Sequence, residues 1–376
     1  MNEAKREIMK IAVDARTMGS RPSGVGMYLF DFLKQLVKYD EFEFVLLSDV
    51  ADSEYIKYFA QRGVEVRTSN EHVYKSAGVY SYFAFVKKEL ADIKPDVFWE
   101  VNSLIPIKLK GDFKTMITVH DMFPITHVRY FGRVYSIYFR HSLTKTLKNT
   151  DMILYNSEQT KLTTEAIFPE AKSIPNETAY IITNPLDMDY GNSDDGYFLY
   201  IGNMEKRKGV DILLNGYREY RYRKGTKKLV VAGKMLEDDI ERLLYEVQQE
   251  CGDVEYLDYV TDEKKHELYA HCSCFLFPSR AEGFGMPILE AMKHKKPVIV
   301  ANLDIYNEIA DGCLNTFEMQ GFNKINFQID SFVQQMFDYN KEIDEEAYNA
   351  AIERYSPERL GEIVKKFIEE NTDGIL

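Results

Sequence analysis

The sequence has few cysteines and no long apolar run. Its four cysteines lie in the last third of the 376 residues, and only Cys272 and Cys274 are close together. A zinc site needs more ligands and disulfides are typical of small secreted domains, so we expect buried thiols in a reducing compartment. No segment reaches the ~20 apolar residues of a membrane-spanning helix. The N-terminus is too charged for a signal peptide. We therefore expect a cytoplasmic protein, at most peripheral on the cytoplasmic face of a membrane.

An excess of positive charge is also missing. The chain has 47 Lys and Arg against 60 Asp and Glu, a net charge of −13, which argues against a general nucleic-acid binder. Residues 122–150 nevertheless contain no Asp or Glu. Their cations alternate with aromatic residues, as in Arg133, Tyr135, Tyr138, Phe139 and Arg140. Such a stretch either lies on anionic headgroups or packs its aromatics into a core with the cations in solvent, and both interpretations stay open.

The length and the pattern of apolar runs predict two α/β domains. At ~150 residues per domain, 376 residues suggest about two. Short apolar runs alternate with amphipathic stretches, which indicates buried parallel strands joined by helices. The expected strands are Met9–Val13, Phe42–Leu47, Asp96–Trp99, Thr115–Val119, Met152–Tyr155, Tyr197–Gly202, Leu229–Gly233, Cys274–Phe277 and Pro297–Val300. A stretch of turn formers near Asn184–Gly196 predicts the boundary between the domains.

The most informative segment runs from residue 277 to 292 and reads Phe-Pro-Ser-Arg-Ala-Glu-Gly-Phe-Gly-Met-Pro-Ile-Leu-Glu-Ala-Met. A strand should end at Phe277, and Pro287 suits the start of a helix. The free N–H groups of residues 285–289 should then point into the crevice at the strand's carboxyl end, where phosphate or hydroxyl oxygens bind. Glu282 in the turn and Glu290 in the first helical turn flank these donors, which suits a polyhydroxylated ligand. The alternative makes Glu290 a residue that satisfies the helix dipole and Glu282 a solvated loop acid.

This segment resembles the signature of retaining glycosyltransferases of family 4, which have the GT-B fold. The resemblance implies that Glu282 contacts the hydroxyls of the donor sugar and Glu290 the nucleotide ribose. It also implies that the loop between them holds sugar and phosphate through its amides. At matching positions, the further donor-binding residues are Gly283, Phe284, Gly285, Met286 and Pro287.

A second element, residues 200–210, joins a predicted strand to an amphipathic helix. Its three consecutive cations, residues 206–208, either neutralise a pyrophosphate without metal or form a solvated face. The segment resembles the donor loop of the same family, in which an Arg and a Lys bind the diphosphate and stabilise the leaving group. The resemblance implies this role for Arg207 and Lys208, after Gly202 at the start of the loop. Many members have Arg directly after the Gly, where this chain has Asn203.

Residues 14–28 join the first strand to the first helix and contain Gly24 and Gly26. A dinucleotide fingerprint has its glycines directly after the strand, whereas these follow Asp14 by ten residues, and Leu29 stands at the third glycine position. A long glycine loop at a helix start fits a lid whose amides meet phosphate or acceptor. It is similar to the N-terminal glycine-rich loop of family 4, which implies that Gly24 and Gly26 take part in binding.

His120 and Asp121 follow the expected strand Thr115–Val119. They either line a cleft or complete a turn. Family 4 carries His-Asp followed by Pro at this place, with the His close to the donor sugar and its acceptor. The resemblance therefore makes His120 a catalytic candidate and Asp121 a supporting one. Asp187 and Asp189 form a paired-Asp pattern, but they lie in the expected linker, and we interpret them as linker acids and predict no metal site.

Together these elements predict a GT-B protein with two Rossmann-like parallel-sheet domains facing each other across a cleft. Residues 1–188 should bind the acceptor and residues 189–355 the nucleotide sugar, followed by a helix in 356–376 that packs on either domain. The resemblance implies a retaining, metal-independent hexosyltransferase of polysaccharide or glycoconjugate biosynthesis. It implies a UDP- or GDP-linked sugar as donor, a glycan, lipid-linked or other hydroxyl acceptor, and no further cofactor. A non-catalytic GT-B subunit that binds or activates a partner and a sugar-nucleotide epimerase remain alternatives.

Overall fold

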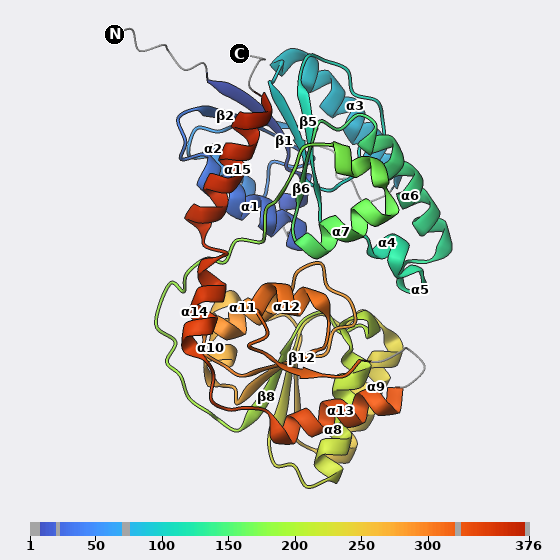
Figure 1. Ribbon diagram of the computed structural model, residues 1–376, viewed down its shortest axis with the longest axis vertical. Coiled ribbons are helices and arrows are strands. Elements are labelled where there is room, and N and C mark those ends of the chain that lie inside the picture. Colours follow the sequence, from blue (N-terminus) through green and yellow to red (C-terminus); the bar gives the residue numbers. More distant parts are fainter. Residues whose placement is uncertain (1–7, 20–22, 70–75, 320–324, 373–376) are drawn as a thin grey trace. The chain divides into compact units, whose positions relative to one another are not determined.

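The computed structural model describes residues 8–19, 23–69, 76–319 and 325–372 (Figure 1). Described residues up to Ile182 and from Ser356 onward form one compact unit, and Thr183–Tyr355 form a second. Each unit is built on its own sheet. Residues 1–7 lie outside the described ranges, and the expectation of a charged N-terminus partly rests on them. Residues 20–22 of the glycine-rich loop also lie outside these ranges.

The first unit contains seven parallel strands in the order β3-β2-β1-β4-β5-β6-β7. Their bounds are β1 Met9–Asp14, β2 Phe42–Ser48, β3 Glu65–Thr68, β4 Val97–Glu100, β5 Lys114–Val119, β6 Met152–Tyr155 and β7 Asn176–Thr178. The strand order reverses between β1 and β4, which pair directly. Open α/β sheets bind ligands outside the carboxyl ends of the strands at such a reversal.

The connections of the first unit are mostly helical. Its helices are α1 Gly24–Leu36, α2 Glu54–Ala60, α3 Ser76–Ile93, α4 Phe123–Thr126, α5 Val128–Phe131, α6 Arg133–Leu147, α7 Glu158–Ile167 and α15 Pro357–Thr372. The C-terminal helix α15 packs on α1: a Cβ on Gly361 would lie 2.8 Å from Cβ of Gln35. Tyr39 OH also donates to Glu362 at 3.1 Å. The helix α15 is therefore part of the first unit.

The second unit contains six parallel strands in the order β10-β9-β8-β11-β12-β13. Their bounds are β8 Tyr197–Ile201, β9 Lys228–Ala232, β10 Val254–Leu257, β11 Cys274–Phe277, β12 Val298–Ala301 and β13 Asn315–Phe317. The helices are α8 Val210–Tyr222, α9 Asp238–Cys251, α10 Asp262–His271, α11 Met286–Lys293, α12 Asp304–Ala310, α13 Ile325–Asp338 and α14 Glu345–Glu353. Here the order reverses between β8 and β11.

All nine strands expected from the sequence are confirmed, each within one residue at either end. The sequence analysis missed β3, β7, β10 and β13, which are the four edge strands of the two sheets. Central strands such as β4 and β11 are buried along their whole length and therefore read as apolar runs. Edge strands such as β3 and β10 are partly exposed and polar, so that no apolar run marks them.

Cys272 and Cys274 are buried free thiols, as expected from the sequence. Burial raises the pKa of the Cys272 thiol to about 12, so the group stays protonated and unreactive. Among the described residues, no helix is long and apolar enough to cross a membrane.

Candidate functional site

The carboxyl ends of β8 and β11 lie next to each other, although β9 and β10 separate them in the sequence. After β8 the chain passes Gly202 and forms a short 3-10 helix, Lys206–Lys208. After β11 it passes Pro278 and enters α11. The two segments that the sequence marked as donor-binding therefore follow adjacent strands at the reversal of the sheet.

Lys208 and Glu282 form an ion pair between these two segments. Lys208 Nζ donates to Glu282 Oε1 at 2.7 Å and to Oε2 at 2.8 Å. The side chains are only 17% and 8% exposed, so water screens the pair less than it screens a surface pair. An ammonium has three donors and a carboxylate roughly four acceptor positions. One donor of Lys208 and further acceptor positions of Glu282 thus remain for a ligand.

Arg207 is held beside this pair by both segments. Its Nη2 donates to Glu205 Oε1 at 2.7 Å, and its Nη1 donates to the carbonyl oxygen of Ala281 at 3.1 Å. The backbone N–H of Arg280 donates to the carbonyl of Arg207 at 3.0 Å. The structure therefore brings Arg207, Lys208 and Glu282 into one cluster.

Arg280, which the sequence analysis missed, fastens the two segments together. Its guanidinium is 5% exposed and pairs with both carboxylate oxygens of Asp211 in the first turn of α8, with Nη2 and Oδ2 at 2.9 Å. It also donates to the carbonyl of Lys206. A buried guanidinium needs such partners, and here they fix the position of the 3-10 helix. In the sequence, Arg280 stands at a variable position of the family motif, so nothing marked it as a functional residue.

Gly209 allows the 3-10 helix to lie close to the end of β11. Its φ is +71°, and a Cβ would come within 1.9 Å of the carbonyl oxygen of Pro278. Any other residue would be strained and would displace the backbone. Because residue 209 is glycine, the 3-10 helix can lie close enough to the end of β11 for Lys208 to reach Glu282.

Glu290 lies in α11, which begins at Met286 with Pro287 in its first turn. Glu290 is the fifth residue of this helix, so it lies at the start of the second turn and not in the first turn, where we expected it. Its Oε1 accepts from Lys265 Nζ at 2.8 Å, and its Oε2 accepts from Tyr269 OH at 3.1 Å. The N–H of Ile288 donates to the carbonyl of Gly285 at 3.0 Å, so this amide is already used within the turn.

Lys265 is a second residue that the sequence analysis missed. It lies in α10, and its side chain is 21% exposed beside the 14% exposed Glu290. Burial opposes its charge, but the carboxylates of Glu290 and, at 3.2 Å, Asp262 together raise the pKa of Lys265 above its usual value. The lysine therefore keeps its charge and holds the Glu290 carboxylate in place. A lysine in a charged helix gave no signal because its partner is 25 residues away in the sequence.

His120 directly follows β5 in the first unit. Its Nε2 lies 2.9 Å from the carbonyl oxygen of Val101, and its ring meets the edge of Tyr28 at 4.9 Å. Burial lowers the pKa of His120 to about 4, so the ring is neutral at pH 7. A carbonyl only accepts, so Nε2 carries the proton and Nδ1 is the acceptor. Asp121 accepts from the N–H of Phe123 at 3.0 Å, which makes it part of the turn.

The glycines of the N-terminal loop open α1. Gly24 is the first residue of this helix, and Ser23 caps it by accepting from the N–H of Gly26 at 3.4 Å. Tyr28 lies one turn further along α1. Its ring contacts the ring of His120, and its hydroxyl donates to the carbonyl oxygen of Ala179 at 3.1 Å. The glycine-rich helix start and His120 therefore belong to the same end of the first sheet.

A buried charged cluster at this end had no signal in the sequence. Asp14 ends β1 and Glu100 ends the neighbouring β4. Arg16 Nε lies 2.9 Å from Asp14 Oδ2 and its Nη2 lies 3.4 Å from Glu100 Oε1. Tyr82 OH donates to Asp14 Oδ1 at 2.7 Å. Burial, and then the charge of Asp14, raises the pKa of Glu100 well above its usual range, although the Arg16 guanidinium opposes this rise.

The basic aromatic stretch, residues 122–150, forms α4, α5 and α6. Phe139 is buried, so for this residue the interpretation that the aromatic side chains pack into the core is correct. On α6, Val134 is 85% exposed and Ile137 70%, while Tyr135 and Tyr138 are also exposed. Large apolar side chains therefore stand in solvent between the cations.

Asp187 and Asp189 make local contacts in the segment before β8. Asp187 Oδ1 accepts from Tyr190 OH at 2.8 Å, and Asp189 Oδ1 accepts from the N–H of Gly191 at 2.8 Å. Both carboxylates thus stabilise turns of this segment.

Comparison with known proteins gives the same assignment for both halves of the chain. Residues 22–190 match the family described as Glycosyltransferase Family 4, and residues 190–319 match Glycosyl transferases group 1. The chain is 31% identical over 238 residues to O-antigen chain mannosyltransferase B of Escherichia coli, which covers 58% of this chain and 60% of that protein. It is 22% identical over 311 residues to O-antigen chain mannosyltransferase RfbU of Salmonella typhimurium, covering 79% of this chain and 83% of that protein.

Solved structures show the same fold over nearly the whole chain. The Anabaena protein HepE, solved in complex with UDP and glucose, matches with a TM-score of 0.72 at 17% identity, covering 96% of this chain and 100% of that chain. WaaG, a glycosyltransferase involved in lipopolysaccharide biosynthesis, matches with a TM-score of 0.67 at 14% identity, covering 98% and 100%. These likenesses confirm the predicted GT-B fold with two Rossmann-like parallel-sheet domains.

The two family matches run from residue 22 to residue 319 and meet at residue 190. They include both glycines of the N-terminal loop, His120, the Lys208 and Glu282 pair, and Glu290. Motifs, fold and family matches agree: the chain belongs to glycosyltransferase family 4.

Proposed function

We propose that the protein is a retaining glycosyltransferase that moves a hexose from a UDP- or GDP-linked donor to a hydroxyl acceptor in cell-surface polysaccharide biosynthesis. The observation that carries the proposal is the shielded pair of Lys208 and Glu282 beside Arg207, at the carboxyl ends of β8 and β11. This pair offers a cation for a phosphate and acceptor oxygens for sugar hydroxyls in the same few ångströms.

The cations act on the leaving group. Lys208 uses two of its three donors on Glu282, which leaves one for a diphosphate oxygen. Arg207, fixed by Glu205 and Ala281, supplies a second positive charge. Charge develops on the diphosphate as the bond to the sugar breaks, and cations already held in position stabilise it without reorganisation. We propose that this makes a metal ion unnecessary.

The two glutamates hold the donor. Glu282 accepts hydrogen bonds from the sugar hydroxyls, and Glu290 accepts from the ribose, with Lys265 and Tyr269 fixing its carboxylate. The loop residues 283–286 lie between them and bring backbone amides to sugar and phosphate, while Pro287, which has no N–H, starts α11. Gly202 at the start of the other segment is assigned with them. We assign these residues to donor binding by their place in the family motif.

His120 acts from the first unit, together with the α1 start at Gly24 and Gly26. Its neutral ring donates from Nε2 to the Val101 carbonyl, so Nδ1 is available to accept from a hydroxyl of the sugar or the acceptor. We propose that the acceptor attacks the face from which the diphosphate leaves, through an oxocarbenium-like state, so that the anomeric configuration is retained. No covalent nucleophile is assigned.

The relatives suggest the sugar and the acceptor to test first. Two of them are named O-antigen chain mannosyltransferases. We propose a mannosyl donor and a glycan or lipid-linked acceptor. The exposed apolar side chains among the cations of residues 122–150 support a peripheral contact with an anionic membrane, on its cytoplasmic face.

A panel of UDP- and GDP-sugars, including GDP-mannose, tests the proposal. The protein is incubated with each donor and a glycan acceptor, with and without EDTA, and products are identified by mass spectrometry and NMR. We expect one donor to be consumed, an acceptor product with retained anomeric configuration, and equal rates with EDTA. Inversion would overturn the retaining mechanism, and loss of activity in EDTA would overturn metal independence.

The same panel separates the two alternatives. Formation of an epimeric sugar without acceptor would identify a sugar-nucleotide epimerase. Failure of every donor to bind would identify a non-catalytic subunit. The shielded Lys208 and Glu282 pair favours the enzyme, because a subunit without turnover has no need of a diphosphate site.

A further inference from the structure

A buried carboxyl group and the histidine of the first unit contact the same peptide group, which joins Val101 to Asn102 and is called the 101–102 peptide below. Its N–H donates to Glu100 Oε1 at 2.8 Å. Its carbonyl oxygen accepts from His120 Nε2 at 2.9 Å. A trans peptide is a rigid plane whose N–H and C=O point in opposite directions. A group that fixes the N–H therefore also fixes the direction of the carbonyl that the histidine meets.

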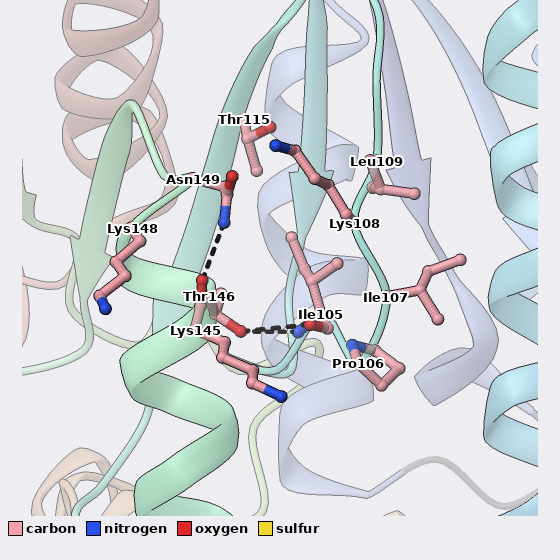
Figure 2. Close-up of a pocket in the computed structure, with 10 residues that line it drawn as sticks. All are labelled: Ile105, Pro106, Ile107, Lys108, Leu109, Thr115, Lys145, Thr146, Lys148 and Asn149. Atoms are coloured by element: carbon pink, nitrogen blue, oxygen red, sulfur yellow. Dashed lines mark hydrogen bonds between the residues drawn. The ribbon is translucent and has the colours of Figure 1, made fainter.

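The chain on either side of this peptide is held independently. Before it, Glu100 ends β4, which pairs with both β1 and β5. After it, Ser103 Oγ donates to the carbonyl of Thr118 at 2.7 Å. The N–H of Ile105 then donates to Thr146 Oγ1 at 3.0 Å, and Figure 2 shows this bond beside a pocket at the end of α6. These contacts place the turn, but none of them involves the N–H or the carbonyl of the 101–102 peptide.

Charge balance does not require Glu100. Arg16 Nε lies 2.9 Å from Asp14 Oδ2, whereas its Nη2 lies 3.4 Å from Glu100 Oε1. One carboxylate neutralises one guanidinium, and Asp14 is the closer of the two. Burying a second carboxyl group costs free energy unless hydrogen bonds compensate it. The bond from the N–H of Asn102 is shorter than the contact with Arg16, so the peptide is the main partner of Glu100.

Glu100 accepts at Oε1 even when it carries a proton. Burial, and then the charge of Asp14, raises the pKa of Glu100 well above its usual range, and a hydrogen bond between the two carboxyl groups adds to the rise. A protonated carboxyl group donates from one oxygen and accepts at the other. Because Oε1 faces both Arg16 and the N–H of Asn102, it is the accepting oxygen. The proton therefore lies on Oε2, toward Asp14.

The role of Glu100 is to orient the peptide and not merely to satisfy it. Asn102 is exposed, so water could accept from its N–H, but water would leave the peptide free to turn over. A reversed peptide would present its N–H to His120, whose ring would then accept at Nε2 and carry its proton on Nδ1. Glu100 opposes this arrangement, because a reversed peptide would place a carbonyl oxygen against the accepting Oε1.

We propose that Glu100 is a positioning residue of sugar transfer: it holds the 101–102 peptide so that the carbonyl faces His120 and the proton of the ring stays on Nε2. Nδ1 is then the atom that accepts from a hydroxyl of the sugar or of the acceptor. The inference rests on the proposed function of His120 and adds the group that sets its tautomer. Glu100 acts through the peptide and the ring, not on the substrate itself.

Three variants of the full chain separate this role from a structural one. Glu100→Gln keeps an oxygen for the N–H of Asn102 and a donor for Asp14, so it copies the protonated carboxyl group. Glu100→Met has a similar length but no oxygen. Tyr82→Phe is the control, because it removes the hydroxyl that donates to Asp14 Oδ1 at 2.7 Å and leaves Glu100 in place. It disturbs the same buried cluster without touching the 101–102 peptide.

The first measurement reads the histidine ring without any substrate. Long-range ¹H–¹⁵N NMR spectra at pH 7 show which ring nitrogen carries the proton, and the His120 signals are assigned by their loss in His120→Gln. In the wild type, Glu100→Gln and Tyr82→Phe we expect one tautomer, with a slowly exchanging proton on Nε2. In Glu100→Met we expect the tautomer with the proton on Nδ1 to appear, and exchange at Nε2 to become about tenfold faster.

The second measurement is turnover, followed as GDP released from GDP-mannose or as the diphosphate released from another donor of the panel that is consumed. Glu100→Met should lower kcat about 10- to 100-fold, because small displacements of a positioned group cost up to about 100-fold. KM for the donor should change by less than about twofold, since the diphosphate and ribose contacts are assigned to the second unit. Glu100→Gln should restore kcat to within about twofold of the wild type.

The third measurement needs no variant of Glu100. In the wild type, the amide proton of Asn102 and the Nε2 proton of His120 should exchange with the same opening free energy, because both bonds depend on one peptide. Rapid exchange of the Nε2 proton while the amide stays protected would show that the peptide does not hold the ring. This test decides the matter even if Glu100→Met fails to fold.

The outcomes separate this inference from the proposed function. An unchanged His120 tautomer or an unchanged kcat in Glu100→Met would overturn the positioning role, and so would equal losses of kcat in Glu100→Met and Glu100→Gln. A change in Tyr82→Phe as large as in Glu100→Met would assign the effect to the whole cluster and overturn it too. If the wild type consumed no donor, the proposed function would fail, and the tautomer and exchange measurements would still decide whether Glu100 holds His120.

Discussion

Lys208 and Glu282 are 74 residues apart in the sequence, and the ammonium group of one lies 2.7 and 2.8 Å from the two carboxylate oxygens of the other. Each is the other's counter-charge in a place shielded from water. Removing one partner leaves the other charge buried without compensation. The two residues therefore have to be tested separately, with binding and turnover measured for each.

Replacing Lys208 by Met should weaken the binding of a nucleoside diphosphate about 10- to 100-fold, since a hydrogen bond to a charged group contributes about 1.5–3 kcal/mol. Titration calorimetry with UDP and GDP measures this. Lys206→Met is the matched control, because Lys206 belongs to the same 3-10 helix but pairs with Asp239. Equal affinities of the two variants would remove Lys208 from the diphosphate site.

Replacing Glu282 by Ala should impair sugar transfer more than nucleoside-diphosphate affinity, because the carboxylate is assigned to sugar hydroxyls. The variant frees Lys208 from its partner, and UDP or GDP should bind at least as well as in the wild type. Transfer rates and diphosphate affinities are compared in the same preparation. If both fell by the same factor, the division of roles between Glu282 and Lys208 would be wrong.

Replacing Lys265 by Met should weaken binding of a whole nucleotide but not of inorganic pyrophosphate. Lys265 orients Glu290, which is assigned to the ribose, and pyrophosphate has no ribose. We expect about a tenfold loss for UDP or GDP and less than a twofold change for pyrophosphate. Lys264→Met is the control, because Lys264 pairs with the exposed Glu267. A parallel loss for both ligands would indicate a general structural role instead.

Breaking the contact between Arg280 and Asp211 should destabilise the second unit. Arg280→Met leaves the Asp211 carboxylate without its partner, and removal of one member of a buried pair costs about 3–5 kcal/mol. Arg280→Met combined with Asp211→Leu removes both charges and should restore most of the loss. Calorimetric unfolding of the three proteins checks this, and a double variant less stable than Arg280→Met would refute the explanation.

The pH dependence of stability should change when Glu100 is replaced by Gln. In the unfolded chain Glu100 loses its proton near pH 4.5, whereas in the folded protein its pKa is raised well above that value. The folded state thus binds more protons above pH 4.5, and its free energy of unfolding falls as the pH rises. The Glu100→Gln variant lacks this group, so its free energy of unfolding should not show this fall with rising pH.

Chemical unfolding at pH 5 and pH 8 measures the effect. The stability of Glu100→Gln relative to the wild type should increase from pH 5 to pH 8. A constant difference between the two proteins would show that Glu100 ionises normally in the folded state.

The sequence by itself determined the parts of the molecule that depend on short stretches of chain. Central strands such as β4 and β11 are buried on both faces, and each contains a run of apolar residues that can be read without any partner. The helix start near Pro287 and the spacing of Glu282 and Glu290 are equally local. For that reason the family and most of the candidate residues were found from the sequence.

The tertiary structure alone decided which distant residues meet. The edge strands are short and polar, so only pairing with a neighbouring strand shows that they are strands. Lys265 and Arg280 look like ordinary surface cations until the fold sets them against Glu290 and Asp211. Asp14 and Glu100 meet because β1 and β4 are neighbours where the strand order reverses. These contacts depend on the order of strands in a sheet, and residues far apart in sequence carry no local pattern that announces their partners.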